Sequence, residues 1–182
     1  MNDIQINKLA EKIYEQNKAV GWWDDPNRCI YQTLQLVSTE IAEATEGERK
    51  ELNDDHLTWR AMGEVELADA LIRILDLGGR YMWIYKKESP YWALAMRTAP
   101  ESIAGKHLML NMALIDLTKT ILMYDDTKSI SHNYSVLIDS IVFVAEQQGY
   151  DVWGALSEKL EYNQKRADHK RENRAKEGGK KF

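Results

Sequence analysis

The chain has 182 residues, enough for one domain with a substantial core or for two small repeats packed together. Its hydrophobic share of 44% and charged share of 29% are ordinary for a globular protein, and its few Gly and Pro residues favour helices over strands. The single cysteine, Cys29, excludes an intramolecular disulfide and a cysteine-based zinc site. The polar N-terminus and the lack of an apolar run of about 18 residues predict a cytoplasmic protein without a membrane span.

Hydrophobic residues recur at intervals of three and four along most of the chain, which is typical of amphipathic helices. In chain order this spacing predicts helices over about residues 4–20, 28–50, 57–81, 106–124, 134–148 and 151–176. The connection 86–105 contains Pro90 and Pro100, so we expect it to be irregular, with a short helix around Trp92–Arg97. No segment alternates as a strand does. The sequence therefore predicts an all-α bundle of about five to six helices with a four-helix catalytic core.

We expect a single domain over residues 1–182. Its parts are a catalytic helical hairpin at 18–82, a second hairpin at 105–149, and a basic helix with a flexible tail at 150–182. From residue 158 onward there are nine Lys or Arg and five Asp or Glu, so this end carries +4 and the rest of the chain −9. A basic end on an acidic body is typical of nucleic-acid binding, and it equally supplies cations to a phosphate ligand.

Two pairs of acidic residues mark the candidate chemistry. Glu40-x-x-Glu43 lies in the second predicted helix and Glu66-x-x-Asp69 in the third, and a spacing of three puts each pair on one helix face. Antiparallel packing of these helices brings the four carboxylates together, where two charges about 4 Å apart repel by roughly 4 kcal/mol at an effective dielectric near 20. A hard divalent cation such as Mg²⁺ removes that repulsion. The alternative is an ordinary solvated face, which the polar stripe of the third helix also fits.

The second predicted hairpin keeps part of this pattern. Asp116 aligns with Glu43 and Asp139 aligns with Asp69, whereas apolar residues take the other two acidic positions. This hairpin is either a duplicated unit that has lost half of its carboxylates or a chance similarity between two amphipathic hairpins.

The histidines argue against a di-iron site. Four-helix di-iron sites use Glu-x-x-His, and the chain contains no such sequence. A site made of oxygen ligands alone is the better inference, and we expect the histidines at the surface or in the tail: His56, His107, His132 and His169.

The combined acidic pattern resembles the E-x-x-E…E-x-x-D signature of the MazG-like, all-α nucleotide pyrophosphohydrolases. The apolar run Leu67–Gly79, the segment Glu158–Arg166 and the terminal GGKKF are similar to the context of that signature in the family. The resemblance covers roughly residues 18–82 and 150–182, and residues 86–148 match less well.

The resemblance implies a reaction and a set of residues. Water would attack the α-phosphorus of a nucleoside triphosphate, and pyrophosphate would leave. The Mg²⁺ ligands, with Mn²⁺ as a substitute ion, would be Glu40, Glu43, Glu66 and Asp69. Glu40 or Glu43 would orient or deprotonate the water, and Asp76, two turns beyond Asp69, is expected as an outer-shell group.

The last predicted helix and one loop supply candidate substrate contacts. Lys159, Asn163 and Arg166 share a helix face, and the family's lysine–asparagine pair in this region implies contacts to phosphate or sugar oxygens. The alternative is a solvated basic helix. Trp22 and Trp23 precede the first acidic helix, and we expect one of them to pack and the other, assigned as Trp22, to stack on a base.

Further large apolar side chains are expected in the core or between subunits of a homodimer or homotetramer. These are Met82, Trp83, Trp92, Met96, Met109, Met112 and Trp153.

Three functions compete at this point. The first is the Mg²⁺-dependent pyrophosphohydrolase, and the second is a catalytically inactive helical regulator that binds a nucleotide or a metal. The third is a nucleic-acid-binding bundle, whose affinity would fall steeply with salt. The complete set of four carboxylates favours the first, so we expect a nucleoside triphosphate as the partner and no nucleic acid.

Overall fold

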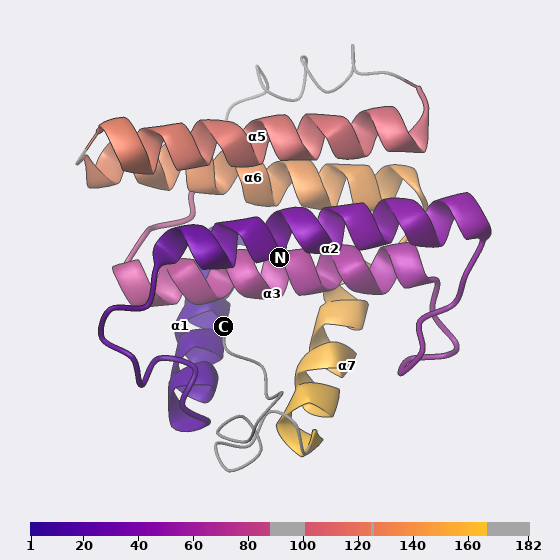
Figure 1. The fold of residues 1–182 in the computed structure, drawn as a ribbon, viewed down its shortest axis with the longest axis horizontal. Coiled ribbons are helices and arrows are strands. Elements are labelled where there is room, and N and C mark those ends of the chain that lie inside the picture. The colour runs from indigo at the N-terminus through magenta and orange to yellow at the C-terminus, as the bar shows by residue number, and fades with distance from the viewer. Residues whose placement is uncertain (88–100, 125, 167–182) are drawn as a thin grey trace.

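The computed structural model describes residues 1–87, 101–124 and 126–166. These residues form six helices and one isolated β-bridge, which confirms the predicted all-α bundle. The helices are α1 (Asp3–Ala19), α2 (Ile30–Lys50), α3 (Met62–Tyr81), α5 (Ile103–Met123), α6 (Thr127–Gln147) and α7 (Val152–Lys165) (Figure 1). No described helix combines the length and the hydrophobicity that a bilayer crossing needs.

α3 lies at the centre of the molecule. It packs against α1, α2, α6 and α7, and its apolar residues from Val65 to Leu77 are buried as a result. α2 and α3 form one hairpin, and α5 and α6 form a second hairpin that lies on the first, with α5 against α2 and α6 against α3 (Figure 1). α1 and α7 extend from the other side of α3 (Figure 1). The two stacked hairpins form a four-helix core, and α1 and α7 pack against its α3 face.

The contact between α1 and α3 depends on a glycine. A Cβ atom at Gly79 would lie 2.4 Å from the carbonyl oxygen of Ala10, so only a residue without a side chain allows the two helices to approach this closely. The approach carries Asn17, in the last turn of α1, to a position where it hydrogen-bonds Asp76 of α3.

α3 begins at Met62 rather than near the predicted residue 57. The carboxylate of Asp54 accepts hydrogen bonds from the backbone N–H groups of His56 (2.9 Å) and Leu57 (2.6 Å), which fixes a turn where the periodicity indicated a helix. Leu57 is buried under this turn, so its hydrophobicity reflects a loop that packs on the core.

α6 begins earlier than predicted, at Thr127 rather than near residue 134. Asp126 caps the helix, because its carboxylate accepts hydrogen bonds from the N–H groups of Lys128 (3.2 Å) and Ser129 (3.0 Å). Residues 127–133, which precede the predicted helix, therefore form the first turns of α6. The expected short helix around Trp92–Arg97 and the chain beyond residue 166 lie outside the described residues.

The prediction of a surface position is wrong for His107. Its side chain is buried between α5 and α2, and its Nδ1 atom lies 2.8 Å from the hydroxyl oxygen of Thr45. Among the described residues its Nε2 atom has no hydrogen-bond partner, and burial lowers the pKa of His107 to about 4. His56 and His132 are exposed, as predicted, and His169 lies outside the described residues.

Two methionines expected in the core or between subunits lie at the surface of the single chain, so they are not core residues. Met82 and Met112 are 78% and 51% exposed, whereas Trp83 is buried. Met112 lies on an exposed apolar face of α5 with Leu108, Ile115 and Leu122. The expected homo-oligomer stays a prediction.

Candidate functional site

A cleft of about 460 Å³ lies beside α3, and every residue that the sequence analysis assigned to the site lines it. These residues are Trp22, Glu40, Glu43, Glu66, Asp69, Asp76, Lys159, Asn163 and Arg166. They come from the loop before α2, from α2 and α3, and from α7 and the residue after it, so segments far apart in sequence build one cavity. A merely solvated helix face would point to bulk water rather than into a cleft shared with three other segments.

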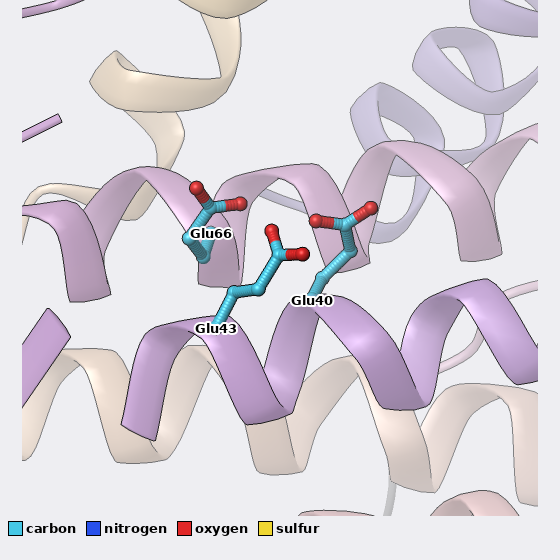
Figure 2. Close-up of side chains that lie close together, drawn as sticks. All are labelled: Glu40, Glu43 and Glu66. Atoms are coloured by element: carbon cyan, nitrogen blue, oxygen red, sulfur yellow. The ribbon is translucent and has the colours of Figure 1, made fainter. Parts of the chain in front are cut away.

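Three of the predicted metal ligands meet in this cleft. Glu40 and Glu43 project from α2 toward Glu66 on α3 (Figure 2). One carboxylate oxygen from each lies within 4.8 Å of the others, a separation that suits a shared cation. Glu40 and Glu66 are buried, and Glu43 is exposed. We call Glu40, Glu43 and Glu66 the acidic triad.

The electrostatics of the acidic triad favour a bound cation. Burial, with the added repulsion of Asp69 and Glu40, raises the pKa of Glu66 to about 9. Burial and the charge of Glu40 also raise the pKa of Glu43. Without a cation the triad therefore holds a proton at neutral pH. A bound divalent ion would neutralise the repulsion between the carboxylates and so displace that proton.

Asp69, the fourth predicted ligand, is bound to a lysine instead of joining the triad. Its carboxylate lies 3.0 Å from the ammonium nitrogen of Lys159, which is also 3.7 Å from Asp54. The Lys159 side chain is only 5% exposed. Burial lowers the pKa of Lys159, but the carboxylates of Asp69 and Asp54 outweigh it, so the net shift is upward and the lysine stays charged.

Arg73 neutralises a second member of the cluster. Its Nε atom donates a hydrogen bond of 2.6 Å to Glu40, and its guanidinium forms an ion pair with the same carboxylate. Arg73 is not among the site residues predicted from the sequence. Its position four residues after Asp69, on the same helix face, was the available signal.

The described lining of the cleft is acidic. Among the residues that the structure describes, seven carboxylates line it against four Lys or Arg side chains, which are Arg28, Arg73, Lys159 and Arg166. An anionic ligand therefore needs cations to accompany it into the cleft.

Asp76 lies at the other end of the cleft from Glu66. It is buried, and one of its oxygens accepts a hydrogen bond of 3.0 Å from the indole N–H of Trp23. Burial raises the pKa of Asp76 to about 6, against the lowering effect of hydrogen bonds from Trp23 and Asn17. None of these partners belongs to the acidic triad, so the outer-shell role of Asp76 stays a prediction.

The two neighbouring tryptophans differ as expected. The ring of Trp23 packs edge-to-face against Tyr14 and Tyr81, with ring centroids 6.0 and 6.4 Å away. Trp22 lines the cleft, half-buried. Stacking of a base on Trp22 stays a prediction.

The side chains at the C-terminal part of α7 and just after it are also suited to ligand contact. Arg166 does not share the helix face of Lys159 and Asn163 as predicted, because α7 ends at Lys165 and Arg166 is extended. The side-chain oxygen of Asn163 is buried and has no hydrogen-bond partner among the described residues, which is unusual for a buried polar atom. Arg166 lies over the ring of Tyr162, and His56 stacks on the same ring at 4.6 Å. Both His56 and Arg166 line the cleft.

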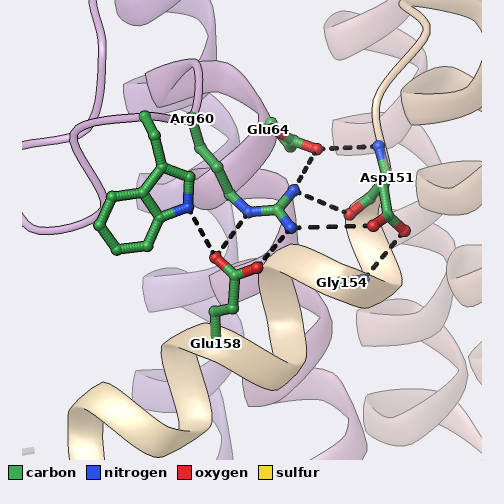
Figure 3. A network of polar contacts seen from close by, with 6 residues as sticks. Arg60, Glu64, Asp151, Gly154 and Glu158 are labelled. Atoms are coloured by element: carbon green, nitrogen blue, oxygen red, sulfur yellow. Dashed lines mark hydrogen bonds and ion pairs between the residues drawn. The ribbon is translucent and has the colours of Figure 1, made fainter.

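A network around Arg60 holds α7 and the loop before α3 in place (Figure 3). The guanidinium of Arg60 forms ion pairs of 2.8 Å with Glu64 at the start of α3 and with Glu158 of α7. Trp59 also donates a hydrogen bond of 3.0 Å to Glu158. Because Glu158 precedes Lys159, the network positions the lysine that pairs with Asp69.

The second hairpin has no comparable cluster in the part of the chain that the structure describes. Asp116 is exposed and lies 3.6 Å from Lys119, and Asp139 accepts a hydrogen bond of 2.6 Å from the hydroxyl of Tyr85. The two alternatives for the origin of this hairpin therefore stay open.

Comparisons of the chain with protein-family models, with curated proteins and with solved structures find no match.

Proposed function

We propose that the chain is a divalent-metal-dependent nucleoside triphosphate pyrophosphohydrolase. The observation that supports this proposal is the convergence of the acidic triad, Asp69 and the cations Lys159 and Arg166 in one cleft. Carboxylates alone are suited to a metal, and cations alone to a phosphate. A metal–triphosphate substrate needs both within the same cavity.

The acidic triad fits a hard divalent cation such as Mg²⁺ or Mn²⁺. Its donors are all carboxylate oxygens, and the raised pKa values of Glu43 and Glu66 favour a positively charged partner. Such a cation, when bound, neutralises phosphate charge and lowers the pKa of water that attacks phosphorus. The fourth predicted ligand, Asp69, would first have to leave Lys159.

Each residue has a role in the proposed reaction. Glu43 accepts the proton of the attacking water, because it is exposed to the cleft while Glu40 is paired with Arg73. The water oxygen bonds to the α-phosphorus, and the bond from that phosphorus to the bridging oxygen breaks. The electron pair leaves with pyrophosphate, whose charge Lys159 and Arg166 stabilise. Asn163 holds an oxygen of the phosphate or the sugar through its amide.

One observation favours a second candidate, a helical regulator that binds nucleotide without hydrolysing it. Arg73 and Lys159 already form ion pairs with Glu40 and Asp69, so two of the four predicted metal ligands have their charge neutralised without a metal. A binding protein would keep that arrangement, whereas a hydrolase would exchange it for a cation on substrate binding.

A panel of ribo- and deoxynucleoside triphosphates with Mg²⁺ in ¹⁸O-labelled water tests the proposal. We expect pyrophosphate to form and the label to enter the monophosphate, with activity falling by at least about 100-fold in Glu43→Gln. Asp55→Asn, which removes an exposed carboxylate from the rim, is the matched control and keeps most of the activity. Tight nucleotide binding without any product would establish the regulator instead.

A further inference from the structure

The cleft is long enough to separate a phosphate end from a base end. Glu66 of the acidic triad and Asp76 are ten residues apart on α3, which at a rise of 1.5 Å per residue is about 15 Å. That is about the length of an extended nucleoside triphosphate from its terminal phosphate to the far edge of its base. With the triphosphate at the acidic triad, the base therefore reaches the end of the cleft where Asp76 lies.

The residues at that end differ in kind from those at the triad. The carboxylate residue Asp76 is only 3% exposed, and it still lines the cleft. Trp22 and Arg28 line the same end, with the Arg28 guanidinium 5.9 Å from the centre of the Trp22 ring. An aromatic ring, a cation and a buried hydrogen-bond acceptor are the groups that recognise a planar base with polar edges.

We propose that the carboxylate of Asp76 accepts a hydrogen bond from the ring nitrogen of the base, and that it thereby selects guanine, uracil and thymine over adenine and cytosine. This inference rests on the proposed function only in that the cleft must hold a nucleotide. It gives Asp76 a role at the base in place of the outer-shell role at the metal.

The selection follows from hydrogen-bond polarity. An ionised carboxylate has about four acceptor sites and no donor, and the Trp23 indole and the Asn17 amide use two of them in Asp76. Guanine presents N1–H at its ring edge, and uracil and thymine present N3–H, so each donates to the carboxylate. Adenine N1 and cytosine N3 carry a lone pair at the same place, which the carboxylate repels. The guanidinium of Arg28 complements the carbonyl that adjoins the ring N–H in the selected bases.

Binding of non-hydrolysable α,β-methylene analogues of dGTP, dUTP, dATP and dCTP, with Mg²⁺ and the full chain, tests the inference. We expect the first two to bind about 10- to 100-fold more tightly than the last two, the effect of one hydrogen bond to a charged group. Asp76→Asn should reduce this difference to within about threefold, because the amide can donate as well as accept. Asp55→Asn, which removes the same charge from the rim, should leave the ranking unchanged.

The outcomes separate the two proposals. Equal binding of all four analogues, or an Asp76→Asn variant that weakens all four equally, would overturn the inference, since a purely structural Asp76 acts that way. The expected ranking without pyrophosphate release from the natural triphosphates would support the inference and overturn the hydrolase. If no analogue binds, both are overturned.

Discussion

Lys159→Met tests whether the lysine is the internal counter-ion of the cleft. The substitution keeps most of the side-chain volume but leaves Asp69 and Asp54 without the ammonium group that lies 3.0 and 3.7 Å from them. Removing one partner of a buried ion pair costs about 3–5 kcal/mol. Asp69 can take up a proton, because burial already raises its pKa, so we expect the lower figure of about 3 kcal/mol.

A loss of about 3 kcal/mol in a chain of this length lowers the melting temperature by roughly 6–12 °C. Thermal unfolding followed by circular dichroism at pH 7 measures it, with Lys165→Met, an exposed position on the same helix, as the control. Added Mg²⁺ should restore several degrees to the Lys159→Met protein, because a divalent cation replaces the missing charge. A variant that melts within about 1 °C of the parent protein would refute the counter-ion role of Lys159.

Three further changes probe the charges of the fold. The pKa of Glu66 is raised to about 9, so the folded state keeps a proton that the unfolded state releases, and stability falls as pH rises through this range. As the pH rises from 5 to 9, the melting temperature of Glu66→Gln should therefore exceed that of the metal-free parent by a growing margin. A margin that stays constant over this pH range would contradict this. The pKa of His107 is lowered to about 4, so the stability that its neutral side chain contributes is fully present above pH 6.5 and is lost as the pH falls toward 4. When the pH is lowered from 6.5 to 4, the free energy of unfolding measured in urea should fall by roughly 3 kcal/mol less in His107→Met than in the parent protein. Arg60→Met should reduce the free energy of unfolding by about 2 kcal/mol, because it removes the ion pairs with Glu64 and Glu158. The control Arg49→Met, at an exposed position, should reduce it by less than about 0.5 kcal/mol. Similar losses in both variants would rule out the Arg60 network as a structural link.

Much of the fold follows from hydrophobic periodicity. The apolar residues of α2 and α3 recur at helical spacing, and both helices end within a residue of the predicted position. The starts of α3 and α6 were less predictable, because a carboxylate that accepts backbone hydrogen bonds can either build a turn or cap a helix. Asp54 does the first and Asp126 does the second, and only the tertiary packing of the residues after each carboxylate distinguishes them.

The members of the candidate site were predictable, but their pairing was not. Spacing along α2 and α3 placed Glu40, Glu43 and Glu66 on facing sides, and the structure brings their oxygens together. The ion pair of Asp69 with Lys159 depends on how α7 crosses α3, which a sequence pattern does not encode. The burial of His107 is not predictable from the sequence, because a polar residue on an otherwise apolar helix is usually exposed, whereas here α2 covers it.

Titration of the metal-free protein with Mn²⁺, followed by electron paramagnetic resonance, tests most directly whether the acidic triad holds a divalent cation. We predict saturable Mn²⁺ binding that Mg²⁺ displaces and that weakens by at least about tenfold in Glu40→Gln and in Glu66→Gln. Glu46→Gln changes a half-buried carboxylate one turn beyond the triad on α2 that pairs with Arg49, and it should bind as the parent protein does. Mn²⁺ affinity that is the same in all four proteins would contradict the account.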